Sequence, residues 1–300
     1  MRWIFLSFTA LAAILVAASF MGLGRSHTGT VVNCVGSTSV QPFAELLAQE
    51  YEHVQQSPSA QPPAPMTQAW NGHGAPAPEP VRVDVQGGGS TAGIQAIAED
   101  IADIGMCSRQ LKKDEADLYQ GIVIAFDGLA VVVHPSNPVA DLSLSQIRDI
   151  FRGRLTNWNQ VGGPDRPIRL ITREEGSGTR EAFTKLVMEA GRKAGDPPCR
   201  ISRSAMTQES NGAVKELVKH DRAAIGYMSL GLVHGELRML AVDGVTPTLE
   251  AVKAKRYPLV RPFLFVVKGE PDPSAKGFID YVLSPAGQGL LQKEGLVSVQ

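Results

Sequence analysis

The stretch VRVDVQGGGSTAGIQAIAEDIADIGMCSR, residues 81–109, decides the fold of this chain. Val81 to Val85 alternates apolar and polar side chains as a strand does, and a helix is predicted from about Ala92 to Glu99. Ala102 to Met106 is predicted to be the next short strand. A strand, a loop of small residues, a helix and a second strand form a βαβ unit, which predicts a mostly parallel sheet with helices on both faces.

The rest of the chain continues this alternation of strands and helices. Before the quoted stretch, residues 30–35 are predicted to form a strand and residues 42–51 a helix. After it, apolar runs at 122–126 and 129–134 predict two strands that Asp127-Gly128 separates. The remaining patterns predict strands over 168–172, 224–228 and 259–268 and helices over 143–151, 178–190, 213–219 and 276–291.

The order of these elements predicts an α/β protein of two lobes. Residues 29–135 and 232–300 are expected to share lobe 1, and residues 136–231 to form lobe 2, with crossover connections between them. A chain of 300 residues is long enough for two domains that each bury a core. Ligands of such sheets bind in the crevice at the carboxyl ends of the strands, so the site is expected there.

Residues 1–28 are predicted to be a targeting segment. Arg2 precedes an apolar run from Trp3 to Met21, and small residues follow, which is the pattern of a secretory signal peptide. A run of about 20 residues can also span a bilayer, so an uncleaved N-terminal anchor is the alternative. No cysteine ends the run as a lipoprotein signal requires. In either case we expect the body of the protein to be exported.

The composition indicates a soluble globular protein. Apolar residues make up 43% and charged residues 20%, and the net charge of -1 lacks the basic excess typical of nucleic-acid binding. Residues 57–80, rich in Pro, Ala and Gln, are predicted to be a flexible surface insertion from which Trp70 could dock back. Cys34, Cys107 and Cys199 are interpreted as small buried hydrophobes, although an oxidising compartment would permit one disulfide.

Three strand-to-helix turns combine glycine with small hydroxyl residues. They are Gly36-Ser37-Thr38-Ser39, Gly87-Gly88-Gly89-Ser90-Thr91 and Gly176-Ser177-Gly178-Thr179. The first turn of a helix has unpaired N–H groups and the positive end of the helix dipole, so an oxyanion binds well there. One such turn is most often only a helix cap, but three that converge would form a cage of neutral donors.

Two arginines strengthen the prediction of an oxyanion site. Arg173 lies at the end of a predicted strand, three residues before Gly176, and Arg109 follows Ser108 at the end of another strand. A guanidinium group can donate two parallel hydrogen bonds to a tetrahedral oxyanion. Arg180 is interpreted as a solvated surface charge.

The segments GSTSVQPF, VQGGGSTAGIQAI, ADIGMCSRQL, AFDGLAVVVHPSNPV, REEGSGTREAF and AIGYMSLG follow one another in this order. Here the sequence resembles the periplasmic phosphate-binding proteins of ABC transporters, from Val31 to the C-terminus. The resemblance implies the type II periplasmic-binding-protein or Venus flytrap fold, in which two lobes joined by crossover hinge strands close over a dehydrated phosphate. It also implies a periplasmic protein, expected to be a monomer, that delivers inorganic phosphate to permease subunits in the inner membrane.

The resemblance further implies which residues bind phosphate. They are Thr38, Ser39, Ser90, Ser108, Arg109, Arg173, Ser177, Gly178 and Thr179. Glu175 matches an acidic position that pairs with the arginine, so it is expected to orient Arg173. Asp127 and Asn211 lie in recurrent family segments without an assigned contact. Some members carry an aspartate where this chain has Ser108, and since that carboxylate repels ionised sulfate, selectivity for phosphate over sulfate is left open.

Other functions match parts of the sequence. Gly87 to Ala92 fits the dinucleotide pattern G-x-G-x-x-A, but no acidic residue follows the next strand where a ribose would need one. No G-x-S-x-G elbow occurs and the six histidines are scattered, so we expect no catalysis, cofactor or metal. A phosphate sensor or scavenger without its own permease is the alternative that the sequence leaves open.

Overall fold

The computed structural model describes residues 30–56, 80–193, 195 and 197–300. Two predicted segments lie outside the described residues: the targeting segment at 1–28, and the insertion at 57–80 except for residue 80. Trp70 lies outside them as well. Across the described ranges, no helix is both long enough and apolar enough to cross a membrane.

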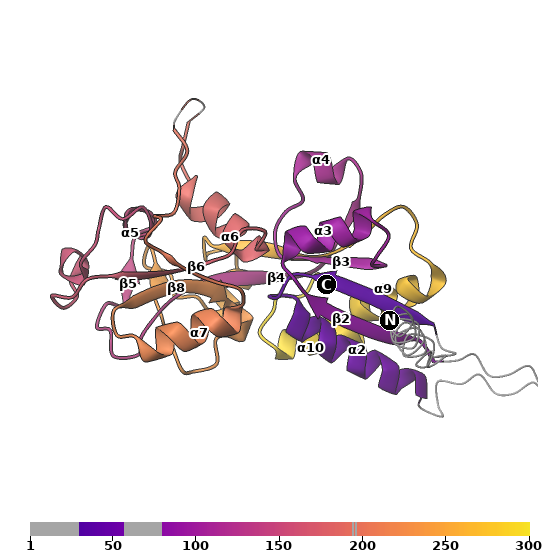
Figure 1. Cartoon of the computed structure of the whole chain (residues 1–300). Coiled ribbons are helices and arrows are strands. Elements are labelled where there is room, and N and C mark those ends of the chain that lie inside the picture. The colour runs from indigo at the N-terminus through magenta and orange to yellow at the C-terminus, as the bar shows by residue number, and fades with distance from the viewer. Residues whose placement is uncertain (1–29, 57–79, 194, 196) are drawn as a thin grey trace, which may run out of the picture.

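Lobe 1 combines elements from both ends of the chain. It contains β1 (Val31–Gly36), α2 (Gln41–Gln56), β2 (Arg82–Gly87), α3 (Ser90–Ala98), β3 (Ile104–Cys107), α4 (Lys113–Ala116), α9 (Pro273–Leu283) and α10 (Pro285–Lys293). Figure 1 shows α3 and α2 on opposite faces of its strands, as the βαβ pattern predicts.

Lobe 2 is built from the middle of the chain. Its strands are β5 (Asp141–Leu142), β6 (Arg169–Arg173), β7 (Met206–Gln208), β8 (Ala224–Ser229), β9 (Arg238–Met239) and β10 (Ala241–Val242). Its helices are α5 (Leu144–Phe151), α6 (Gly178–Phe183), α7 (Asn211–His220) and α8 (Leu249–Lys253), with the 3-10 helices η2 (Trp158–Val161) and η4 (Leu230–Leu232) and the π-helix η3 (Thr184–Met188). The single helix predicted over 178–190 is therefore α6 followed by η3.

Strands β4 (Gln120–Val133) and β11 (Val260–Val267) connect the lobes, and Figure 1 shows β4 running from one lobe into the other. Over the described residues the main sheet has nine strands in the order β2-β1-β3-β11-β4-β8-β6-β7, with β9 beside β4. β2, β1 and β3 are parallel, and so are β8, β6 and β7. β11 and β4 are antiparallel to their neighbours. The predicted mostly parallel sheet thus occurs within each lobe.

Each lobe buries its own apolar core. In lobe 1, Phe43, Phe265 and Phe278 are buried among aliphatic side chains. In lobe 2, Phe183 stacks on Tyr227 with ring centroids 3.9 Å apart, in a core that also buries Trp158. Burying one such large side chain contributes about 1.5–3 kcal/mol of hydrophobic free energy, so the two cores stabilise the lobes separately.

The prediction that Asp127-Gly128 separates two strands is wrong, because β4 continues through both residues. Asp127 is fully buried and forms an ion pair with Arg261, its partner residue on β11, so the polar side chain does not interrupt the strand. A Cβ at Gly128 would lie 2.9 Å from a Leu230 side-chain carbon, so glycine lets lobe 2 pack closely on this strand.

The closing helix predicted over 276–291 is also corrected. The chain forms α9 and α10 with a break at Ser284, whose backbone is extended. Pro285 follows, and a proline disfavours helical backbone at the residue before it. Ser284 caps α10 by accepting a hydrogen bond from the Gly287 N–H at 3.3 Å.

Candidate functional site

The predicted hydroxyl residues gather where the strands of the two lobes end. Ser37, Thr38 and Ser39 follow β1, Ser108 follows β3, and Ser90 begins α3. From lobe 2, Ser177 caps α6 and Thr179 lies in its first turn. Gly36 makes the first turn possible: its φ is 142°, and a Cβ there would stand 2.3 Å from the Met106 carbonyl oxygen. The lack of a side chain thus lets the end of β1 press against β3.

Except for half-buried Thr38, the hydroxyl residues of this cluster are buried, and hydrogen bonds join the two lobes here. Ser39 Oγ and Thr179 Oγ1 are 2.7 Å apart, and Ser39 Oγ also accepts a hydrogen bond from Asn211 Nδ2 at 2.9 Å. Within lobe 1, Ser37 Oγ donates to Ser108 Oγ at 2.8 Å. The Ser108 N–H donates to Ser90 Oγ at 3.1 Å. Groups this close to one another can share a single tetrahedral anion.

Gly178 closes the cluster from the side of lobe 2. A Cβ at this position would lie 2.1 Å from Ser90 Oγ and 2.6 Å from Ser108 Oγ. Only glycine therefore lets the start of α6 approach the hydroxyls of lobe 1. The Ser177 hydroxyl accepts a hydrogen bond from the Arg180 N–H at 3.3 Å, so it acts as the cap of α6.

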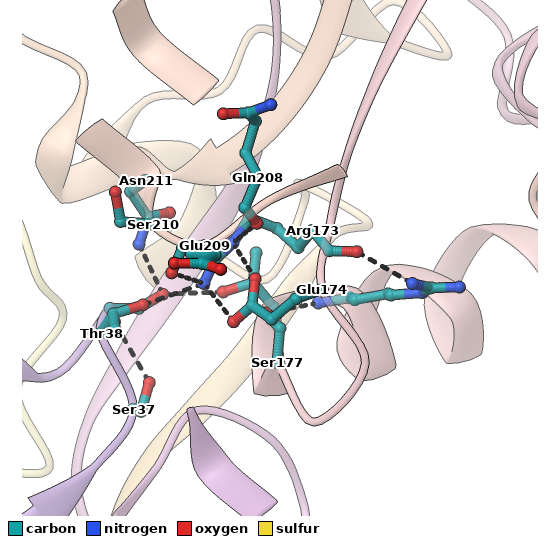
Figure 2. Close-up of polar contacts among 12 residues, drawn as sticks. Ser37, Thr38, Arg173, Glu174, Ser177, Gln208, Glu209, Ser210 and Asn211 are labelled. Atoms are coloured by element: carbon teal, nitrogen blue, oxygen red, sulfur yellow. Dashed lines mark hydrogen bonds and ion pairs between the residues drawn. The ribbon is translucent and has the colours of Figure 1, made fainter. Parts of the chain in front are cut away.

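Arg173 brings a positive charge to the cluster. Its side chain is 1% exposed, and Nη2 donates to Thr38 Oγ1 of lobe 1 at 2.9 Å (Figure 2). Nε and Nη2 also donate to the two carboxylate oxygens of Glu174, both at 2.9 Å. Among the described residues, the buried Nη1 has no hydrogen-bond partner. This leaves one side of the guanidinium able to bind an anion.

The expectation that Glu175 orients Arg173 is wrong. Glu174 does so through the contacts above, whereas the Glu175 side chain is 92% exposed and its carboxylate lies 3.8 Å from Arg180. The two glutamates are adjacent in the sequence, and the local pattern alone does not tell which of them faces inward. Arg180 itself donates to the Arg173 carbonyl oxygen at 3.0 Å, so it is more than a solvated surface charge.

Arg109 is the one predicted arginine that faces away from the hydroxyl cluster. Nη1 and Nη2 pair with the Glu115 carboxylate at 2.6 and 2.8 Å, and Nε lies 2.9 Å from Glu181 of lobe 2. Arg109 lines a cavity of about 690 Å³ between the lobes, together with Lys112 and Arg180. The structure therefore places Arg109 in an ion-pair network across the cleft rather than among the hydroxyls.

Arg261 of β11 was not predicted as a site residue, yet it reaches the cluster. Its Nη1 donates to Thr179 Oγ1 at 2.8 Å and to the Ser108 carbonyl oxygen at 3.2 Å. Its Nε donates to Asp127 Oδ2 at 2.9 Å. Burial raises the pKa of Asp127 and lowers that of Arg261, and their mutual attraction opposes both shifts. The sequence did contain a signal for this pair: Asp127 and Arg261 are isolated charged residues within the mostly apolar strands β4 and β11.

The two family positions without an assigned contact are connected to the cluster. Asn211 donates to Ser39 as described, and its Oδ1 accepts from the Ser229 N–H at 3.2 Å. The Ser229 hydroxyl donates to Asp127 Oδ1 at 2.8 Å. Elsewhere, Cys34, Cys107 and Cys199 are free and buried as interpreted, and burial raises the pKa of the Cys34 and Cys107 thiols.

Comparison with known sequences identifies the family. A family model described as the PBP superfamily domain matches residues 24–286. The phosphate-binding protein PstS of Bacillus subtilis is 31% identical over 206 residues, which cover 67% of this chain and 66% of that protein, just under two thirds of its length. PstS of Borreliella burgdorferi is 26% identical over 90% of both chains.

Solved structures give the same result. A Clostridium perfringens structure described as a phosphate ABC transporter substrate-binding protein with bound phosphate is 37% identical, with a TM-score of 0.77 over 90% of this chain and all of that one. An ABC-type phosphate transport receptor from Vibrio cholerae is 32% identical, with a TM-score of 0.68 over the same shares. The family and the periplasmic-binding-protein fold predicted from the sequence are confirmed: the chain belongs to the PBP superfamily and, within it, to the substrate-binding proteins of phosphate ABC transporters.

Proposed function

We propose that this chain binds inorganic phosphate between its lobes and delivers it to the permease of an ABC transporter. The observation that carries the proposal is the cluster at the lobe interface, where hydroxyls of the two lobes meet at Ser39 and Thr179 and the buried Arg173 guanidinium of lobe 2 contacts Thr38 of lobe 1. The names of the Bacillus and Clostridium relatives support the choice of phosphate.

The chemistry of the cluster suits a dehydrated oxyanion. Half-buried Thr38 and buried Ser39, Ser90, Ser108 and Thr179 offer neutral hydroxyl donors, and Arg173 Nη1 offers a charged one. Hydrogen bonds that involve a charged group are about twice as strong as neutral ones, so Arg173 should contribute most to affinity. The ion pairs of Arg173 with Glu174 and of Arg261 with Asp127 keep the surrounding charge balanced before an anion enters.

Phosphate would act as a bridge between the lobes. Because it contacts residues of both, it stabilises the closed arrangement by the contacts that only this arrangement allows. We place the hinge in β4 near 126–129 and in the return path between 231 and 262. The bounds expected for lobe 2, 136–231, are extended in this proposal to include β9, β10 and α8, which pack with the lobe-2 core, so that the chain returns to lobe 1 along β11. The closed form would be the one that the permease recognises.

The proposed role is that of an exported, monomeric binding protein without catalytic activity. The sequence pattern of residues 1–28 supports export to the periplasm, by a cleaved signal or an anchor. Substrate-binding transport proteins rather than enzymes make up the relatives described above. Delivery to a permease would require only that the cluster opens when the lobes separate.

Calorimetric titration of the purified protein with phosphate and then sulfate at pH 7 tests the proposal. We expect tight binding of phosphate at one site per chain. Comparable heats with both anions would replace phosphate specificity by a broader oxyanion specificity, since Ser108 carries no charge to repel sulfate. No heat with either anion would overturn the proposed function.

A further inference from the structure

Arg261 joins the two lobes at the point where β4 and β11 cross. Its side chain is 1% exposed and that of Asp127 is 0% exposed, so both charges are withdrawn from water. Nη1 alone donates hydrogen bonds to Thr179 of lobe 2 and to the Ser108 carbonyl of lobe 1. An arginine that only neutralised Asp127 would not need these further contacts.

Arg261 and Asp127 belong to a closed ring of hydrogen bonds. The ring passes from Asp127 to Arg261, Thr179, Ser39, Asn211 and Ser229 and returns to Asp127. Ser39 and Thr179 are the members of the ring that are also proposed to bind phosphate. The other members hydrogen-bond to these two hydroxyls directly, as Arg261 and Asn211 do, or through one of those two residues, as Asp127 and Ser229 do.

The direction of each hydrogen bond follows from the chemistry of its donor. A guanidinium has only protons to give, so Thr179 Oγ1 must accept from Arg261, and Ser39 Oγ likewise accepts from the amide nitrogen of Asn211. Each hydroxyl has one proton. Because the Ser39–Thr179 contact uses only one of the two protons, the other remains available to an anion.

We propose, on the basis of the phosphate site proposed above, that Arg261 is a positioning residue of that site. In this arrangement Thr179 Oγ1 accepts hydrogen bonds from Arg261 and from the Ser39 hydroxyl, so that its own proton is donated to the bound anion. Asp127 holds the guanidinium in place and balances its charge. Arg261 therefore acts on phosphate through Thr179 rather than as a free cation.

The test compares phosphate affinity in two backgrounds, with Thr179 and with Thr179→Val. Removing only Arg261 would leave Asp127 buried and unpaired, so the main variant is Asp127→Leu together with Arg261→Met, because apolar replacement of a buried ion pair often preserves folding. Arg261→Lys serves as a second variant that keeps the charge but loses the forked geometry. Thermal unfolding of each variant shows whether it folds.

We expect the double variant to bind phosphate roughly 10- to 100-fold more weakly when Thr179 is present, the range for losing one hydrogen bond to a charged group. In the Thr179→Val background the same change should weaken binding less than about threefold, since no hydroxyl is left to direct. Arg261→Lys should give an intermediate loss with Thr179 present and a similarly small one without it.

An equal loss in both backgrounds would overturn the inference, because Arg261 would then act independently of Thr179. Unchanged affinity in the double variant and in Arg261→Lys would also overturn it while leaving the proposed function intact. If the wild-type chain itself gives no heat with phosphate, the proposed function falls and the inference falls with it. The wild-type titration therefore separates the two failures.

Discussion

The ends of β3 and β6 look alike in the sequence but differ in the structure. Each places small hydroxyl residues and an arginine after a buried strand: Ser108-Arg109 after β3, and Arg173 at the end of β6 with Ser177 to Thr179 beyond it. Arg173 turns toward the hydroxyls of the other lobe, whereas Arg109 turns toward Glu115 and Glu181. Their hydroxyl residues nevertheless meet in one cluster.

The difference lies in the carboxylates that surround each arginine. Glu115 on α4 binds both terminal nitrogens of Arg109, and Glu181 approaches from lobe 2, so three carboxylate contacts occupy that guanidinium. Arg173 pairs with one carboxylate, that of Glu174, and its buried Nη1 has no hydrogen-bond partner in the part of the chain that the structure describes. In the proposed function we therefore expect Arg173, rather than Arg109, to bind the anion, because its carboxylate partner leaves part of the guanidinium unpaired.

The largest expected effect is the loss of phosphate binding in Arg173→Ala. Removing the charge that faces the anion should cost about 2–5 kcal/mol, or roughly 30-fold to several thousand-fold in Kd. Arg109→Ala, the matched change at the other strand end, should weaken binding less than about tenfold because its partners are carboxylates. Calorimetry on both variants makes the comparison, and equal losses would show that the two arginines do not differ in role.

The neighbouring glutamates provide the next test. Glu174→Gln keeps the shape of the side chain but offers Arg173 one good acceptor instead of two, so the guanidinium loses part of its orientation. The removal of a negative charge near the anion works in the opposite direction, and we expect a net weakening of about five- to tenfold. Exposed Glu175→Gln should bind like the wild type. If Glu175→Gln weakens phosphate binding more than Glu174→Gln does, then Glu175 orients Arg173, as expected from the sequence.

Local patterns predicted the parts of the fold and site that local chemistry controls. The turn after β1 needs Gly36 because its backbone has a positive φ, and Ser39, Ser90 and Thr179 follow such turns directly. These residues were identified because strand, glycine, hydroxyl and helix occur in immediate succession. Apolar runs in the sequence predicted seven of the nine strands that the main sheet has over the described residues. The short strands β7 and β9 were missed, and β4 was wrongly split at Asp127-Gly128.

The parts that sequence reasoning missed depend on partners from distant segments. Asp127 looked like a strand break because an isolated aspartate is costly to bury, and only Arg261 on β11 makes the burial tolerable. The orientation of Arg109 depends on Glu181, which comes from the other lobe. A single sequence does not indicate which far segments meet, so these pairings could not be derived.

A smaller effect is expected from Glu181, which connects the lobes at the edge of the cleft. Its carboxylate lies 2.9 Å from Arg109 Nε, 3.3 Å from Lys112 Nζ and 3.3 Å from Thr91 Oγ1, all of them in the N-terminal part of the chain. Glu181→Gln should reduce the closed population and weaken phosphate binding about two- to fivefold, as partly exposed ion pairs contribute little. Calorimetry would measure the Kd for phosphate, and small-angle scattering without phosphate would measure the closed population, with Glu175→Gln as the control variant. If neither quantity changes in Glu181→Gln, Glu181 has no role in closing.

The smallest effect concerns the pH dependence of stability near Arg109. Burial raises the pKa of Glu115, but hydrogen bonds from Arg109 and the Lys112 N–H outweigh it, so the pKa lies below its usual value. A lowered carboxyl pKa stabilises the fold above the unfolded value of about 4.3, and this contribution disappears as pH falls through the folded value. Wild type should therefore exceed Glu115→Gln in urea stability by about 1 kcal/mol or less at pH 7, and the gap should close below about pH 4.

A matched control separates this pair from the general effect of acid. Glu270 is exposed in the loop after β11, so Glu270→Gln should keep the wild-type pH dependence. A gap between wild type and Glu115→Gln that persisted unchanged into acid would mean that the glutamine variant loses packing rather than charge. Closure of the gap would instead show that the carboxylate of Glu115 keeps Arg109 engaged at neutral pH, which is the physical reason why this arginine differs from Arg173.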